Sequence, residues 1–154
     1  MLRRLLLTAA TVAGLVATLA VTRPALAEGT PAVNWAGDLA EAKQLSDRTG
    51  KPMLIVFGAD WCGFCKKLDA ETLAHPQVSR FINDSFVPVH LDLDTQKRAA
   101  RILEVKTLPC SVVLAPNADQ LGRVVGFEEP SSYFRKLTAA RGLQSNVEPV
   151  GMVR

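Results

Sequence analysis

The sequence predicts an α/β domain with a central, mixed, four-stranded sheet flanked by helices. Apolar strand segments alternate with helical patterns along the 154 residues. A helical stretch separates the strand segments at 53–57 and 86–93, which predicts a parallel pair joined by a right-handed crossover. Only a turn separates the segments at 111–115 and 121–127, which predicts an antiparallel hairpin. Together these connections indicate a sheet with strands in both directions.

The elements in the first half of the chain have clear local patterns. Residues 38–48 carry leucine and alanine at every third position, typical of an amphipathic helix, and Gly50 is a plausible stop. The run at 53–57 is apolar throughout, as expected for a central strand buried on both faces. A helix is expected from about 62 to 73, and Pro76 suits the first turn of another.

The second half ends in a helix and a tail. Thr95 is a candidate cap for a short helix that runs to residue 103. The last helix is expected at about 131–140, with Gly142 as its end. Residues 143–154 have no periodicity and contain two structure breakers, which predicts a loose tail.

Residues 1–27 have the features of a signal peptide. Two arginines precede an uncharged stretch at 5–22, and Ala25 and Ala27 are the small residues that a signal peptidase reads. Cleavage after Ala27 would place the mature protein in the periplasm or outside the cell, with 28–142 as its folded domain. The alternative is a retained transmembrane anchor, although threonines and a glycine dilute the apolarity of the stretch.

The charge balance gives no support for nucleic-acid binding. The whole chain has 18 lysines and arginines against 15 aspartates and glutamates, a formal charge of +3. Three of the arginines lie in the signal segment, so the mature chain is formally neutral. A basic surface for nucleic acid is therefore not predicted.

The segment Trp61-Cys62-Gly63-Phe64-Cys65 follows the first strand and opens the next helix. Two cysteines three residues apart on a helix share one face, close enough for a disulfide. At the start of the helix, unpaired N–H groups and the positive dipole end stabilise a thiolate on Cys62. Because the thiolate attacks disulfides, Cys62 is the candidate nucleophile, and the less exposed Cys65 would resolve the mixed disulfide.

This ordered set of elements and motifs resembles the thioredoxin family over roughly residues 35–143. Residues 57–66 follow the family's active-site signature, Leu108-Pro109 matches its cis-proline loop, and Gly126 matches the glycine after its last strand. The resemblance implies a thioredoxin fold and a thiol–disulfide oxidoreductase. Three further motifs are similar to the secreted or periplasmic thioredoxin-like branch and to the reductase domains related to it: Lys51-Pro52, Lys67-Leu68-Asp69 and His75-Pro76.

The resemblance also implies the substrate-binding residues. In the family the cis-proline loop faces the cysteine pair, and the backbone before the proline pairs with the substrate strand. This assigns substrate contact to Trp61, Gly63, Phe64, Leu108 and Pro109. Phe64 offers the Cys62 thiolate neither charge nor a hydrogen bond, so we expect a less oxidising site than one with histidine there.

Two residues depart from the family pattern. Val56 occupies the position of a buried aspartate that takes the proton from the resolving cysteine. His90 occupies the neighbouring-strand position of a lysine that pairs with that aspartate. An imidazole accepts a proton near neutral pH, so His90 is a candidate proton acceptor. The alternative is that His90 is a strand residue without a role.

Cys110, the third cysteine, follows the proline directly. It is expected to be a small buried hydrophobic residue in place of the family's usual threonine. The alternatives are a second disulfide partner or a third metal ligand close to Cys62 and Cys65. A single Cys-x-x-Cys motif is poor evidence for zinc, so no metal site is predicted.

We expect an extracytoplasmic, monomeric reductase of protein disulfides, with no cofactor besides the Cys62–Cys65 disulfide. Its partners would be client proteins with disulfides or thiols and, because an oxidising compartment would not recharge it, a membrane electron donor. A disulfide oxidase or isomerase is the alternative within the same enzyme class. A non-enzymatic module is the alternative outside it, holding a partner or a soft metal through Cys62, Cys65 and either Cys110 or His90.

Overall fold

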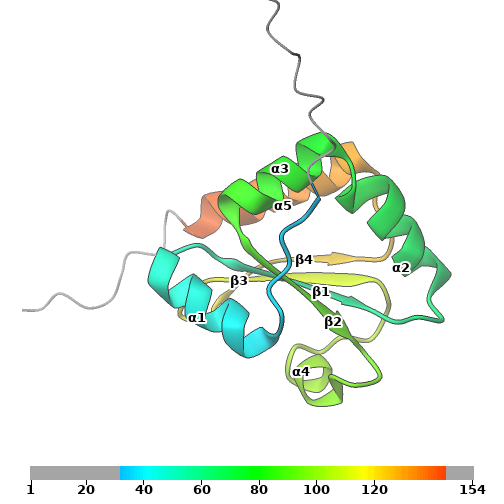
Figure 1. Ribbon diagram of the computed structural model, residues 1–154, viewed down its shortest axis with the longest axis horizontal. Coiled ribbons are helices and arrows are strands. Elements are labelled where there is room, and N and C mark those ends of the chain that lie inside the picture. The colour runs from blue at the N-terminus through cyan, green and yellow to red at the C-terminus, as the bar shows by residue number, and fades with distance from the viewer. Residues whose placement is uncertain (1–31, 145–154) are drawn as a thin grey trace, which may run out of the picture.

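A mixed four-stranded sheet in the order β2-β1-β3-β4 forms the centre of the computed structural model, which describes residues 32–144 (Figure 1). The strands are β1 (Met53–Gly58), β2 (Val87–Asp92), β3 (Cys110–Leu114) and β4 (Gln120–Val125). β1 pairs with β2 in parallel, and β3 is antiparallel to both of its neighbours. The parallel crossover and the antiparallel hairpin predicted from the sequence are both confirmed.

Helices cover both faces of the sheet (Figure 1). They are α1 (Leu39–Thr49), α2 (Gly63–Lys67), α3 (Pro76–Ser85), α4 (Lys97–Ile102) and α5 (Pro130–Gln144), with a π-helical segment η1 (Leu68–Leu73) between α2 and α3. Side chains of η1, α3 and α5 share one hydrophobic cluster with the sheet, and side chains of α1 and α4 share a second. The domain therefore has three layers.

Both faces of β1 are buried, as its uninterrupted apolar sequence predicts. Leu54 and Val56 belong to the cluster under η1, α3 and α5. Met53, Ile55 and Phe57 belong to the cluster under α1 and α4. This alternation is the two-residue period of a strand, and it anchors β1 on both sides. The loop that leaves the end of β1 therefore starts from a fixed point.

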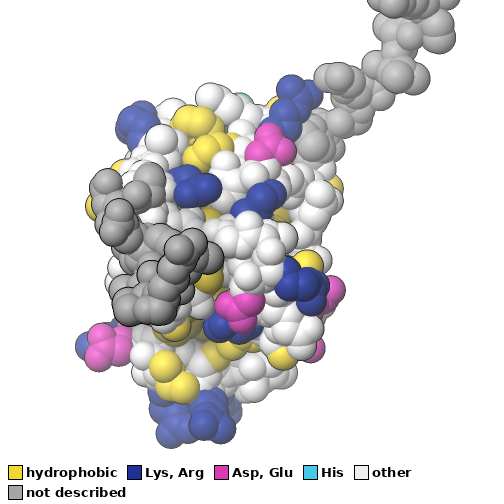
Figure 2. Space-filling model, turned by 90° about the vertical axis from the view of Figure 1, so that its left-hand side faces the viewer, with side chains coloured by type: hydrophobic (Ala, Val, Ile, Leu, Met, Phe, Trp, Pro, Cys, Tyr) yellow, Lys and Arg dark blue, Asp and Glu magenta, His cyan; other side chains and the backbone are white. Residues whose placement is uncertain are grey.

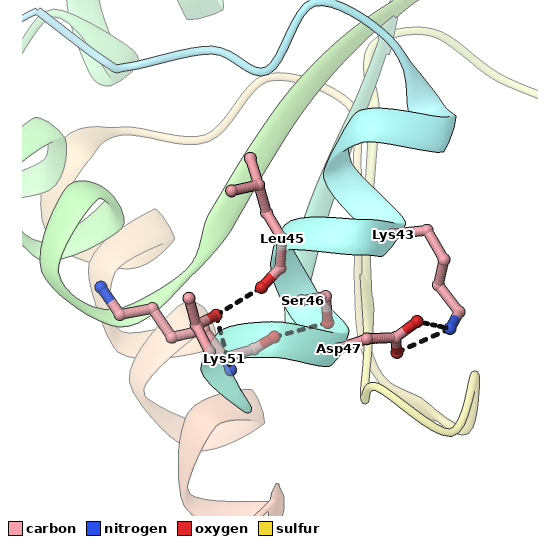
Figure 3. A network of polar contacts seen from close by, with 6 residues as sticks. Lys43, Leu45, Ser46, Asp47 and Lys51 are labelled. Atoms are coloured by element: carbon pink, nitrogen blue, oxygen red, sulfur yellow. Dashed lines mark hydrogen bonds and ion pairs between the residues drawn. The ribbon is translucent and has the colours of Figure 1, made fainter.

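Polar contacts at the end of α1 fix the entry into β1 (Figure 3). Ser46, fully buried, donates its hydroxyl to the carbonyl of Lys51 at 2.6 Å. Lys43 and Asp47 form an exposed ion pair one helical turn apart. Gly50 ends the helix with φ 69°, a left-handed conformation that favours glycine. The predicted helix and its stop are confirmed.

The predicted helix at 62–73 is correct in extent, but its second half is π-helical. The N–H of Ala74 donates to the carbonyl of Asp69, five residues earlier, at 3.0 Å. The wider turn of η1 buries Leu68, Thr72 and Leu73 together. Thr72 also donates its hydroxyl to the carbonyl of Glu128 at 2.5 Å. This distant partner, absent from local sequence patterns, ties η1 to the loop before α5.

Two predicted helix boundaries are wrong. Thr95 does not cap α4, which begins after Gln96; instead its N–H donates to the side chain of Asp92 at 3.0 Å, so it belongs to the turn after β2. Gly142 does not end the last helix, which continues to Gln144. The side-chain amide of Gln144 donates to the carbonyl of Gly50 at 2.6 Å, and this contact favours the extra turn.

The signal peptide expected at 1–27 lies outside the described residues, as do residues 145–154 of the expected tail. Within 32–144, no helix is both long enough and apolar enough to span a membrane.

Candidate functional site

Cys62 and Cys65 form a disulfide at the junction of β1 and α2, with an S–S distance of 2.08 Å. After β1, the N–H of Cys62 donates to the carbonyl of Ala59 at 3.0 Å, and this tight turn leads directly into the helix. Cys62 is the N-cap residue of α2, and Cys65 lies one turn further in. The structure therefore brings the two cysteines together as the sequence predicts.

The two sulfurs have different surroundings. The Cys62 sulfur accepts a hydrogen bond from the backbone N–H of Cys65 at 3.1 Å. Cys62 is 7% exposed and Cys65 is 4% exposed. A backbone donor aimed at the Cys62 sulfur stabilises negative charge there once the disulfide opens. The environment thus favours Cys62 as the thiolate.

Exposed aromatic side chains border the disulfide. Trp61 is 67% exposed and Phe64 is 65% exposed, and Gly63 is exposed between the two cysteines. The indole Nε1 of Trp61 donates to Oδ2 of Asp94 at 2.9 Å. Large apolar side chains that remain exposed around a reactive group are typical of a docking surface.

The segment before β3 lies against the disulfide. Leu108 packs against the small cluster of Ala59, Cys62 and Cys65. The Leu108–Pro109 peptide bond is cis, as the resemblance implies. The carbonyl of Pro109 accepts the N–H of Gly126 at 2.8 Å, and Gly126 has a left-handed φ of 82°. The fold therefore joins the cysteine turn to a loop more than forty residues away in the sequence.

Val56 lies between two polar neighbours on the sheet. It pairs in register with His90 of β2 and with Ser111 of β3, so all three side chains share one face. Val56 itself is fully buried among apolar side chains. The position assigned to a buried aspartate in the family is thus part of the hydrophobic core here.

His90, Asp69 and Cys65 meet around a cavity of about 140 Å³. Nε2 of His90 lies 3.6 Å from Oδ1 of Asp69. A Cβ at Gly58 would lie 3.0 Å from Cε1 of His90 and 3.6 Å from Cβ of Cys65. Glycine at position 58 therefore lets the imidazole approach the resolving cysteine. Trp35 holds the ring edge-on, with centroids 5.4 Å apart.

Sequence reasoning missed the two carboxylates of the site. Asp69 lies four residues after Cys65, a spacing that places two helical side chains on the same face. That spacing was visible in the sequence. Asp94 supports Trp61 across 33 residues, and no local pattern predicts that contact.

A buried hydroxyl pair lies on the same face of the sheet as Val56. Ser111 and Tyr133 share a hydrogen bond of 2.8 Å, and both side chains are almost fully buried. Burial is the main reason that the pKa of Tyr133 is raised well above its usual range. Its phenol is therefore neutral at physiological pH and links α5 to the central sheet.

Cys110 faces the cluster under α1 and α4, because it lies next to Ser111 in β3 and neighbouring strand residues face opposite ways. Burial raises the pKa of its thiol, and the guanidinium of Arg123, 3.6 Å from the sulfur, opposes that shift in part. These surroundings suit a small buried residue. Within residues 32–144, no three histidine, cysteine or acidic side chains converge as metal ligands.

Comparisons with known proteins agree with this geometry. The family profile described as thioredoxin-like matches residues 34–116. Thioredoxin H2-1 of Oryza sativa subsp. japonica is 35% identical over 81 residues, which are 53% of this chain and 55% of the rice protein. The thiol:disulfide interchange protein DsbD of Yersinia enterocolitica is 30% identical over 98 residues, 60% of this chain and 17% of that protein. The chain thus spans about half of one relative and a small part of the other.

A solved structure of a DsbH oxidoreductase has the same fold. The TM-score is 0.68 at 24% sequence identity, and the match covers 81% of this chain and 93% of the other. This likeness shows that the two chains share a fold.

Proposed function

The chain belongs to the thioredoxin-like family, and from this premise we propose that it is an extracytoplasmic thiol–disulfide oxidoreductase that reduces disulfides in client proteins. One observation carries the proposal. The Cys62–Cys65 disulfide lies at the start of α2, against the cis-proline loop and beside exposed aromatic side chains. The names of the rice thioredoxin and of the Yersinia thiol:disulfide interchange protein support the same class of chemistry.

The first step uses Cys62 as the nucleophile. In the reduced protein its thiolate attacks one sulfur of a client disulfide. A bond forms between the Cys62 sulfur and that client sulfur, and the client S–S bond breaks. The second client sulfur leaves as a thiolate and takes up a proton. The backbone N–H of Cys65 stabilises the attacking thiolate.

The second step uses Cys65 to release the client. The Cys65 thiol loses its proton, and the resulting thiolate attacks the Cys62 sulfur of the mixed disulfide. The Cys62–Cys65 bond forms while the remaining client sulfur leaves as a thiolate and is protonated. One client disulfide becomes two thiols, and the protein is oxidised by two electrons. His90 accepts the Cys65 proton, with Asp69 3.6 Å away to stabilise the charged ring.

The surface around Cys62 docks the client chain. Trp61 and Phe64 supply apolar area, and Gly63 leaves space between the cysteines. Leu108, which packs against the cysteine cluster, supplies backbone groups that pair with the client strand, and Pro109 follows it through a cis peptide bond. These roles follow from family membership and from the proximity of the residues to Cys62.

Reduction outside the cytoplasm requires a source of electrons. The signal-like sequence at 1–27, with cleavage after Ala27, supports export to the periplasm or beyond. Such compartments are oxidising and hold no reducing thiol pool. A membrane electron donor therefore returns the Cys62–Cys65 disulfide to its dithiol form. The proposal also takes the protein to act as a monomer.

The reduction potential of the Cys62–Cys65 couple tests the proposed direction. Titrated against glutathione or dithiothreitol, it should lie near or below about −230 mV, on the reductase side of the known range. Phe64 supports this expectation because it offers no charge or hydrogen bond to the thiolate. A potential of about −120 to −180 mV would instead indicate a disulfide donor or isomerase.

His90→Ala should slow release of the client near neutral pH by about a hundredfold, because general-base assistance to Cys65 is lost. Rapid-mixing measurements separate this step from the attack by Cys62, whose rate should not change. Asp69→Asn should give a smaller effect in the same step. His75→Ala is the matched control, since His75 is exposed and caps α3. An unchanged release rate at about pH 6 to 8 in His90→Ala would remove the imidazole from the mechanism.

A further inference from the structure

A groove of about 540 Å³ runs along α4, and its lining combines apolar side chains, two basic side chains and the carboxylate of Asp94. Leu93, Ala100 and Val105 provide apolar surface, and Ala100 is buried at its base. Lys97 and Arg101 line the same groove and are exposed. The groove can therefore accept an apolar side chain between two exposed cations.

The helix that borders the groove and the loop that follows it are together strongly basic. Residues 97–106 contain four lysines and arginines and one glutamate, in a mature chain that is formally neutral. The four cations are exposed, and within the described part of the chain no ion pair or side-chain hydrogen bond engages them: Lys97, Arg98, Arg101 and Lys106. Dark blue side chains gather at the lower end of the molecule in Figure 2, at the height of α4 in Figure 1.

The groove adjoins the redox site. Asp94, at one end of the groove, accepts the hydrogen bond from the indole of Trp61, which is next to Cys62. The N–H of Leu93 donates to the carbonyl of Gly58 at 2.9 Å, at the end of β1. A client whose sulfur reaches Cys62 would therefore carry its neighbouring residues past Trp61 towards α4.

We propose that the α4 groove binds an acidic segment of the client protein, beside the disulfide that reacts with Cys62. This inference rests on the proposed function. Charge complementarity selects the occupant: carboxylates meet Lys97 and Arg101, and an apolar side chain between them covers Ala100 and Val105. Ile102, 69% exposed, adds apolar area on the same helix. Unpaired cations beside a reactive site also attract acidic partners before contact.

The test compares two synthetic disulfide peptides of equal length with the same residues around their cysteines. One carries an Asp-Leu-Asp flank and the other a Lys-Leu-Lys flank. The reduced protein should react faster with the acidic peptide at low salt, and about 1 M salt should reduce the difference. Arg101→Glu should lower the acidic-to-basic rate ratio by roughly fivefold or more.

Arg48→Glu is the matched control. Arg48 and Arg101 are both exposed in the last turn of a helix, so the two changes alter net charge equally. Arg48 lies near the start of β1, whereas Cys62 and Cys65 lie after the end of β1. Arg48 is therefore at the opposite end of the sheet from the disulfide. Arg48→Glu should keep the wild-type ratio. If Arg101→Glu is poorly folded, Lys97→Glu replaces it, because a carboxylate is favourable in the first turn of a helix.

Three results would overturn the inference. The ratio of the rates with the acidic and basic peptides could be near one in the wild type. It could remain unchanged in Arg101→Glu, or Arg48→Glu could lower it as much as Arg101→Glu does. Loss of binding to phosphatidylglycerol vesicles in Arg101→Glu, with an unchanged peptide ratio, would assign the basic helix to a membrane surface instead. Hydroxyethyl disulfide separates the two proposals. If the reduced protein reacts with hydroxyethyl disulfide but does not distinguish the two peptides, only the proposal for the groove is rejected. If it does not react with hydroxyethyl disulfide, the proposed disulfide exchange is rejected.

Discussion

Cys62→Ser should lower the rate of disulfide exchange by on the order of a thousandfold or more, because the hydroxyl that replaces the thiol cannot attack sulfur. The measurement is reduction of a protein disulfide by the pre-reduced variant, followed by the appearance of client thiols. Folding should persist, since Cys62 belongs only to the small cluster with Ala59 and Cys65 and lies outside the two large clusters of the core.

Cys110→Ser is the control for this loss. Cys110 is buried under α4, and its raised pKa keeps the thiol neutral, so it is a poor nucleophile. Its replacement should leave the exchange rate close to that of the wild type. Equal losses in Cys62→Ser and Cys110→Ser would mean that the third thiol takes part in the reaction.

Tyr133→Ala should destabilise the fold by about 3–5 kcal/mol, the range for removing a large buried aromatic side chain. Tyr133 is fully buried in the cluster that joins α5 to β1 and β3. Tyr133→Phe keeps the ring but leaves the buried hydroxyl of Ser111 without its partner, so it should cost about 1–2 kcal/mol. Urea unfolding of the oxidised variants measures both. A loss in Tyr133→Ala no larger than in Tyr133→Phe would contradict this packing.

The phenol of Tyr133 should also make the stability of the fold depend on pH. Burial raises its pKa in the folded state above the value of about 10 in the unfolded chain. The folded state therefore holds a proton that the unfolded state loses above about pH 10, and stability falls as pH rises further. Tyr133→Phe should remove this part of the slope. Identical slopes in the two proteins would show that the phenol does not contribute.

Local sequence patterns were sufficient for most of the fold. Asp38 begins α1 and Gly50 ends it through contacts within a few residues. The apolar run of β1 correctly indicates burial on both faces. The spacing of Cys62 and Cys65 likewise was sufficient to predict their disulfide. Thr95 and Gly142 gave wrong boundaries because Asp92 and the Gln144–Gly50 contact decide those ends instead.

The remainder of the site depends on contacts between distant segments. His90 was a candidate because of its position on β2, but its approach to Cys65 depends on Gly58 and on Asp69 of η1. The indole of Trp61 reaches Asp94 only because the end of β1 and the turn after β2 lie side by side. Tertiary structure creates these neighbours, so their partners could not be identified from spacing alone.

Trapping a client on Cys65→Ser tests the order of attack most directly. The reduced variant can attack a client disulfide but cannot release the client, so a mixed disulfide with one client per protein molecule should accumulate. Mass spectrometry of the digested complex should find the client peptide linked to Cys62. Linkage to Cys110, or a complex of the same yield formed by Cys62→Ser through Cys65, would contradict the assignment of Cys62 as the nucleophile.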